Sequence, residues 1–144
     1  PRLAEWRALC ASLGIASRVH FLGLRLDVEQ ILAAASVVVA PSICDEGFGL
    51  AALEGMAAGR PVVVTDSGPM PEIVEGAGLV VPKRDEIALA AALDRLLHDD
   101  LLARRLGEGG RTRALAAYSM DRYVDELLAV YRRHLLPAAR LRAA

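Results

Sequence analysis

Lysine is almost absent from this 144-residue sequence: Lys83 is the only one, and arginine supplies the rest of the 17 basic residues. With 18 acidic residues the net charge is −1, so the sequence predicts no partner that is recruited by charge alone. Aromatic residues make up only 4% of the chain, which leaves few side chains to stack on exposed bases. Together these shortages argue against nucleic acid as a partner.

Cysteine and histidine are also scarce. Cys10 and Cys44 stand outside any CxxC pair, and the 3 histidines lie on separate segments, so we expect reduced thiols and no metal site. The longest apolar stretch, Ile31–Ala40, is far shorter than the roughly 20 residues that a membrane-spanning helix needs. We therefore expect a cytoplasmic protein with no membrane span, no metal and no resident cofactor.

Apolar strands alternate with amphipathic helices along the chain. The predicted strands are 19–22, 36–40, 61–65 and 78–81, and the predicted helices are 2–13, 28–35, 50–58, 86–98, 101–118 and a last one from 120. Asp27, Asp85 and Ser119 are the expected helix caps. Continuous apolar strands separated by helices indicate an α/β fold, a doubly wound parallel sheet covered on both faces, here with extra C-terminal helices.

The chemistry is concentrated between Pro41 and Pro61. Glu46 precedes a Gly-Phe-Gly turn (47–49), and Glu54 lies more than one turn inside the helix that follows. The start of a helix offers unpaired N–H groups and the positive end of its dipole, which suits phosphate. Carboxylates accept hydrogen bonds from sugar hydroxyls. A diphosphate between two sugars would therefore match the order glutamate, helix start, glutamate.

Other interpretations of this stretch exist. Gly47–Ala52 also fits the G-x-G-x-x-A fingerprint of an NAD(P)-binding oxidoreductase, with Asp66 as the ribose-binding acid. However, six residues separate the strand from the first glycine, and the two glutamates would have no role. A glycosidase would instead use both carboxylates across one bond. Glu54 alone also fits a solvent-facing helix residue.

The order of motifs resembles the C-terminal, donor-binding domain of retaining glycosyltransferases with the GT-B fold, family 4 (glycosyl transferases group 1). The matching segments are Leu13-Gly14, Arg18–Gly23, Pro41-Ser42, Glu46–Leu50, Leu53–Val63, Gly68, Pro71–Val74 and Gly78–Pro82. The resemblance covers roughly residues 9 to 135. It implies a Rossmann-like half of a GT-B fold that binds a nucleotide-diphosphate sugar, usually without a metal.

The resemblance also implies roles for single residues. Glu46 would hold hydroxyls of the donor sugar and is the one tentative catalytic residue, and Glu54 would accept hydrogen bonds from the ribose. Backbone amides of the turn that carries Gly47, Phe48, Gly49 and Leu50 would face the donor sugar and its diphosphate. Gly23 and Leu24 lie where the family places the nucleotide base, although this match is loose.

The sequence departs from the family in several respects: the loop before Gly78 is shorter than usual, Pro69 interrupts the customary turn, and two further departures concern the helix and the diphosphate site. Gly55 stands where the family commonly has alanine, and nothing matches the arginine-bearing strand or the Lys-Gly helix start that clamp the diphosphate. We therefore expect residues 1–136 to form a partial, N-terminally truncated donor domain, with 137–144 as a frayed tail. Its partner would be an acceptor domain of the same protein, and alone it would transfer no sugar. One alternative that stays open is a noncatalytic scaffold of the same fold. Another open point is location, since the full-length enzyme could be attached peripherally to a membrane.

Overall fold

The computed structural model describes residues 2–140, with side chains as far as Leu135. Its elements follow in the order α1 (Arg2–Ser12), η1 (Ala16–Arg18), α2 (Val28–Ala34), β1 (Val38–Ala40), α3 (Leu50–Ala57), β2 (Val62–Thr65), α4 (Met70–Ile73), β3 (Leu79–Val81), α5 (Glu86–His98), α6 (Asp100–Ala117) and α7 (Met120–Arg140). The helices α5 to α7 that follow the last strand confirm the extra C-terminal helices. The predicted tail, 137–144, extends beyond the described residues, and the part within them belongs to α7.

The three strands form a parallel sheet in the order β1-β2-β3. Val38 pairs with Val62 on one side of β2, and Val63 pairs with Leu79 on the other. All four residues of β2 are buried, as its unbroken apolar sequence predicts for a strand covered on both faces.

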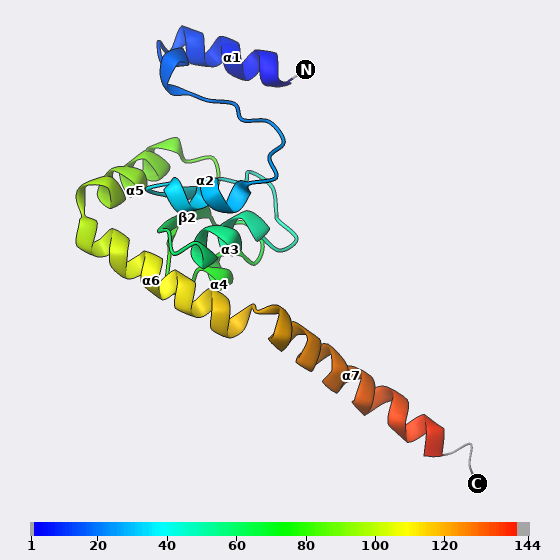
Figure 1. Ribbon diagram of the computed structural model, residues 1–144. Coiled ribbons are helices and arrows are strands. Elements are labelled where there is room, and N and C mark those ends of the chain that lie inside the picture. Colours follow the sequence, from blue (N-terminus) through cyan, green and yellow to red (C-terminus); the bar gives the residue numbers. More distant parts are fainter. Residues whose placement is uncertain (1, 141–144) are drawn as a thin grey trace.

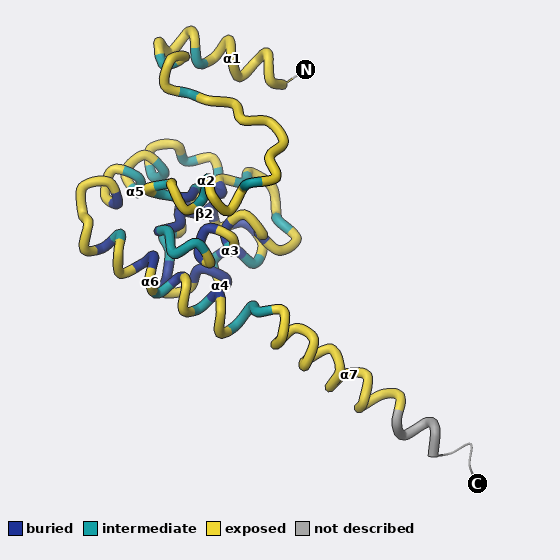
Figure 2. Tube along the Cα trace, viewed as in Figure 1, coloured by how far each residue is buried: buried dark blue, intermediate teal, exposed yellow. Residues whose placement is uncertain are grey.

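Helices cover both faces of this sheet (Figure 1). On one face Val62 and Val64 belong to a buried cluster that includes residues from α3 and α4. On the other face Val63 belongs to a second cluster with residues from α5 and α6. Buried residues are concentrated around the sheet (Figure 2). This arrangement confirms the predicted α/β class, a parallel sheet wound on both sides.

Two local predictions were wrong. Residues 19–22 form no strand, because a strand needs a hydrogen-bonded neighbour and none lies beside this segment in the described chain. Asp27 precedes α2 without capping it, and its carboxylate instead accepts two hydrogen bonds from Arg25, at 2.8 and 2.6 Å. The Asp85 cap is confirmed, since its carboxylate accepts the Ala88 N–H at 2.8 Å.

The two end helices lie apart from the core. An extended segment joins α1 to the core, and α7 projects away from it (Figure 1). As far as Leu135, the large apolar side chains of both helices are exposed, including Trp6 at 54% and Tyr131 at 52%, and Figure 2 colours most of the described part of both helices as exposed. None of the helices between residues 2 and 140 combines the length and apolar character that crossing a bilayer requires.

Gly55 allows α3 to lie unusually close to the sheet. A Cβ atom at this position would come within 2.8 Å of Val38 Cγ1 and 3.1 Å of Val62 Cγ2. Both neighbours are β-branched and stiff, so neither side chain can turn away easily. The glycine that departs from the family pattern is therefore explained by this close contact between α3 and the two strands.

Replacing Gly55 with alanine should destabilise the fold by about 0.5–2 kcal/mol, because overpacking costs about 1–3 kcal/mol and the gain in helix propensity offsets only about 0.5–1 kcal/mol of it. Chemical denaturation would measure the change. Gly109→Ala in α6 is the matched control, since its Cβ would meet only Ala77 Cβ at 3.9 Å. The control should be neutral or stabilising, and a Gly55→Ala protein as stable as the wild type would contradict the packing argument.

Candidate functional site

A cavity of about 490 Å³ lies at the carboxyl end of β1, where open parallel sheets commonly bind ligands. Pro41 follows the strand, and the chain then runs through residues 41–49, which we call the Glu46 loop. This loop and the first turn of α3 line the cavity, together with Met70 of α4. The structure therefore places the predicted strand, loop and helix start around one hollow.

The start of α3 faces this cavity without a side-chain cap. Gly49 precedes the helix with φ 93° and ψ 46°, a left-handed conformation that favours glycine. A Cβ atom here would also approach Met70 Sδ to 3.2 Å. The Ala52 N–H donates to the Gly49 carbonyl at 3.1 Å. No side chain accepts from the first turn, and within the described chain no hydrogen bond engages the Leu50 and Ala51 N–H groups, which are therefore available to a ligand. Together with the helix dipole they make this end of the cavity suitable for phosphate.

Glu46 lies half-buried beside the helix start. The Ser42 hydroxyl donates a hydrogen bond to its Oε1 atom. Among the described residues no hydrogen bond engages the other carboxylate oxygen, which is thus free to accept from a ligand hydroxyl. The Ser42 hydroxyl therefore holds the Glu46 carboxylate at the cavity that the start of α3 also faces.

The Glu46 loop is tied to the ends of the other two strands. Thr65 Oγ1 donates to the Ser42 carbonyl at 2.7 Å. Lys83 Nζ contacts Asp45 Oδ1 at 2.7 Å, and the Lys83 N–H donates to Asp66 Oδ1 at 2.8 Å. The hydrogen bond from Lys83 lowers the pKa of Asp45, and the same bond raises the pKa of Lys83. Sequence reasoning assigned none of these ties, because their partners lie 17 to 38 residues apart.

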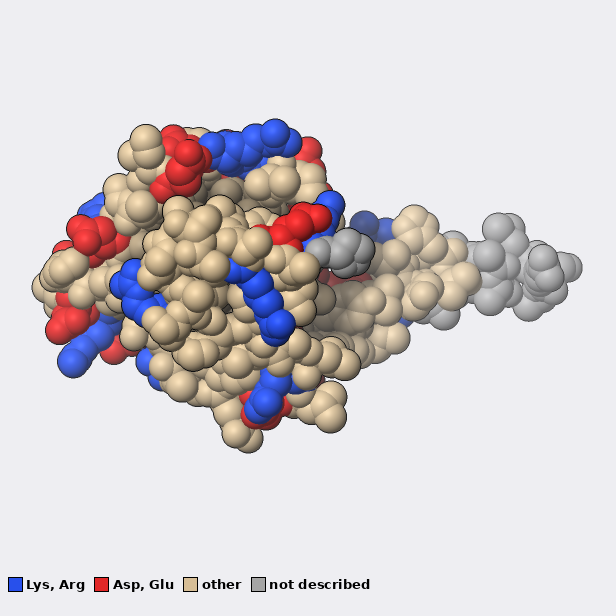
Figure 3. Space-filling view, turned by 90° about the horizontal axis from the view of Figure 1, so that it is seen from above, with Lys and Arg blue, Asp and Glu red and all other residues tan. Residues whose placement is uncertain are grey.

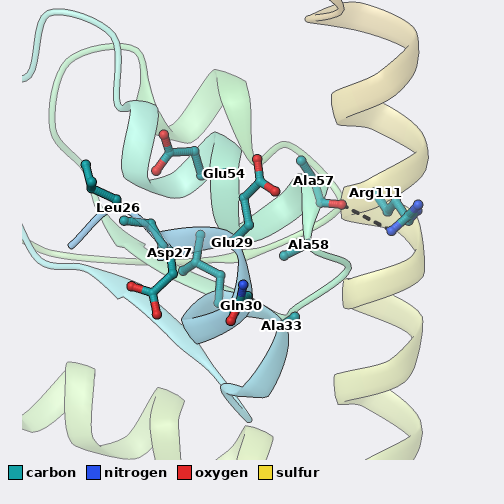
Figure 4. Close-up of a pocket in the computed structure, with 11 residues that line it drawn as sticks. Leu26, Asp27, Glu29, Gln30, Ala33, Glu54, Ala57, Ala58 and Arg111 are labelled. Carbon is teal, nitrogen blue, oxygen red and sulfur yellow. Dashed lines mark hydrogen bonds between the residues drawn. The ribbon is translucent and has the colours of Figure 1, made fainter.

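Glu54 lines a different cavity, of about 620 Å³, between α2, α3 and α6 (Figure 4). Glu29 of α2 and Arg111 of α6 also border it, and Arg111 donates to the Ala57 carbonyl at 3.4 Å. Several carboxylates around one hollow suit a ligand rich in hydroxyl groups. The order glutamate, helix start, glutamate suggests a single crevice for Glu46 and Glu54, but the structure places them at separate cavities.

The two cavities nevertheless follow one another along α3. Ala51 lines the first, and Glu54 and Ala58 line the second. Residues three and four apart share a helix face, so both hollows open along the same side of α3. Gly23 and Leu24 line neither cavity, and Leu24 is 97% exposed. Their assignment to the nucleotide base stays a prediction.

Charge is mixed on at least one face of the chain. On the face shown in Figure 3, basic and acidic side chains are interspersed and neither sign covers a large area. Within residues 2–140, no group of three His, Cys, Asp or Glu side chains could hold a metal ion. The expectation of a metal-independent site stays a prediction.

The match to known proteins decides the family. The family model described as "Glycosyl transferases group 1" matches residues 1–99. The chain belongs to this family. It is 40% identical to the MMP alpha-(1->4)-mannosyltransferase of Mycolicibacterium hassiacum, over 91% of this chain and 33% of that protein. The group 1 glycosyltransferase chain thus spans about a third of the length of the relatives it matches.

Solved structures agree with this family assignment. Sucrose-phosphate synthase from Thermosynechococcus elongatus superposes with a TM-score of 0.84 at 37% identity, covering 94% of this chain and 34% of that one. Anabaena HepE, solved in complex with UDP-glucose, superposes at 0.83 and 26% identity, covering 89% and 36%. The recognition as a C-terminal GT-B domain is confirmed. The comparisons give the oxidoreductase alternative no support.

Replacing Lys83 with methionine should raise the pKa of Asp45 toward its ordinary value of 3.8, because the bond that favours the carboxylate is lost. A lowered pKa contributes stability above the unfolded value, and this contribution is lost as pH falls through the folded value. The difference in stability between the two proteins should therefore vanish in acid. An NMR titration of the Asp45 carboxyl carbon measures the shift.

The matched control is Arg25→Met, which removes the basic partner of a different aspartate, Asp27, away from the Glu46 loop. It should leave the titration of Asp45 unchanged. If Asp45 titrates identically in the wild type and in Lys83→Met, the contact between the loop and the end of β3 does not persist in solution.

Proposed function

We propose that this chain is the donor-binding part of a retaining glycosyltransferase and binds a nucleotide-diphosphate sugar along α3. The observation that carries the proposal is the uncapped start of α3, which faces the same cavity as the Glu46 carboxylate. Unpaired N–H groups suit the diphosphate, and the carboxylate suits sugar hydroxyls. A nucleotide-diphosphate sugar carries both groups, a diphosphate and a sugar with hydroxyls, next to each other.

The order of groups along α3 supports this ligand. Glu46 precedes the helix and Glu54 lies four residues after Leu50, which corresponds to about 6 Å along the helix axis. A nucleotide sugar has its sugar, diphosphate and ribose in the same sequence. We assign the sugar hydroxyls to Glu46, the diphosphate to the amides around Gly47–Leu50, and the ribose hydroxyls to Glu54.

The comparisons support the ligand class. HepE was solved with UDP, and also with UDP-glucose, and its fold matches 89% of this chain. We therefore place a nucleoside diphosphate at the start of α3 here as well. The role of the start of α3 in transfer would be electrostatic, because its fixed N–H dipoles would stabilise the charge that develops on the departing diphosphate.

The remaining parts of the proposal concern the longer protein. The acceptor would be bound by polypeptide outside these 144 residues, since the chain spans only about a third of its relatives. The cations that the family uses at the diphosphate have no counterpart in this sequence. We infer that these residues bind the donor but do not transfer the sugar by themselves.

The test is donor binding by the natural full-length protein, measured by calorimetry with UDP-glucose, GDP-mannose and ADP-glucose, and with NAD and NADP for comparison. The tightest nucleotide sugar should lose about ten- to a hundredfold in affinity on Glu54→Gln, because a hydrogen bond to a charged group contributes about 1.5–3 kcal/mol. Glu46→Gln should weaken the nucleotide sugar but leave free nucleoside diphosphate almost unaffected.

Glu108→Gln is the control, since Glu108 is an exposed residue of α6 that borders neither cavity. It should bind like the wild type. A wild-type protein that binds NAD or NADP but no nucleotide sugar would overturn the proposed function. An unchanged dissociation constant in Glu54→Gln would remove Glu54 from the site.

A further inference from the structure

The turn that follows β2 meets the Glu46 loop through one buried hydroxyl. Ser67 has no exposed surface. Its Oγ atom accepts the Glu46 N–H at 3.1 Å and donates to the Cys44 carbonyl. A serine hydroxyl has one donor and can accept, and here both capacities serve the same short stretch of backbone. Ser67 therefore connects two peptide groups of the loop that otherwise have no partner in a neighbouring strand.

The backbone of the same turn lies directly against Glu46. A Cβ atom at Gly68 would come within 2.3 Å of the Glu46 carbonyl oxygen. Gly68 also has φ +52°, so both the space and the backbone conformation require glycine at this position. Helix α4, which follows this turn, is held at its end by α6. Arg113 of α6 donates to the Ile73 carbonyl at 2.9 Å and to the Glu72 carbonyl at 2.7 Å, at the end of α4.

We propose that Ser67 is a positioning residue for Glu46. This inference rests on the proposed function, because it concerns the carboxylate that would hold the donor sugar. The Ser67 hydroxyl holds the backbone N–H of Glu46, while the Ser42 hydroxyl holds one oxygen of the Glu46 carboxylate. With the backbone and one carboxylate oxygen of Glu46 held, the second oxygen is free to accept at the cavity that Glu46 lines, and binding need not order the loop.

The position of Ser67 separates this role from a general contribution to stability. Both hydrogen bonds of its hydroxyl go to the Glu46 loop, and the Thr65 hydroxyl binds the same loop at Ser42. Without the hydroxyl, the Glu46 N–H and the Cys44 carbonyl lose their partner, while the strands and their hydrophobic clusters stay intact. The loss should therefore affect the loop far more than the fold.

The experiment uses Ser67→Ala in the natural full-length protein, with two readouts. Hydrogen–deuterium exchange at the Glu46 amide should be at least about tenfold faster, because its acceptor is gone. The dissociation constant of the tightest nucleotide sugar should rise by about tenfold. In a Glu46→Gln background the same substitution should add less than about twofold, because a residue that acts through Glu46 cannot act twice.

Val63→Ala is the control for reduced stability. It removes packing on the opposite face of the sheet and touches no residue of the Glu46 loop. It should lower the melting temperature while leaving the donor dissociation constant near the wild-type value. If it weakens binding as much as Ser67→Ala does, the effect of Ser67 is one of stability and the positioning role is refuted.

The outcomes separate this inference from the function on which it rests. Unchanged exchange at Glu46 in Ser67→Ala overturns the positioning role whatever the ligand. Effects of Ser67→Ala and Glu46→Gln that simply multiply overturn it as well. A wild-type protein that binds none of the nucleotide sugars overturns the proposed function, and the exchange rate then still decides whether Ser67 fixes the Glu46 peptide.

Discussion

The rest of the structure depends on β2. It is the central strand, buried along its whole length, and it pairs with both other strands of the sheet. Its two faces contribute Val62 and Val64 to one hydrophobic cluster and Val63 to the other. Because interiors are densely packed, such a strand is a rigid reference for whatever is attached to its ends. The residues that follow it hold the Glu46 loop, so the geometry of the site is set by the most firmly held part of the core.

Helix α3 connects that core to the ligand chemistry. One side of it contacts β1 so closely that only glycine fits at position 55. The adjoining side opens to both cavities, and the first turn supplies the unpaired N–H groups. A shift of this helix away from the sheet would move the start of α3 and Glu54 together. Tight packing on one side is therefore what allows one short helix to present two ligand groups at a fixed spacing.

Sequence patterns predicted the class of fold and most of the elements, because hydrophobic periodicity and caps such as Asp85 are local. They failed at 19–22, where strand formation depends on a neighbour rather than on composition. They also missed why Gly55 is a glycine and what Ser67 does. The answers lie in Val38 and Glu46, 17 and 21 residues away, and no local rule shows such partners. The sequence resemblance assigned site roles to Glu46 and Glu54, but only the structure separates them into two cavities.

A structure of the natural full-length protein with its tightest nucleotide sugar would test the central claim most directly. We expect diphosphate oxygens within about 2.7–3.2 Å of the N–H groups at the start of α3, with sugar hydroxyls at Glu46 and ribose hydroxyls at Glu54. A diphosphate bound away from that helix start, or a ribose that makes no contact with Glu54, would contradict the account.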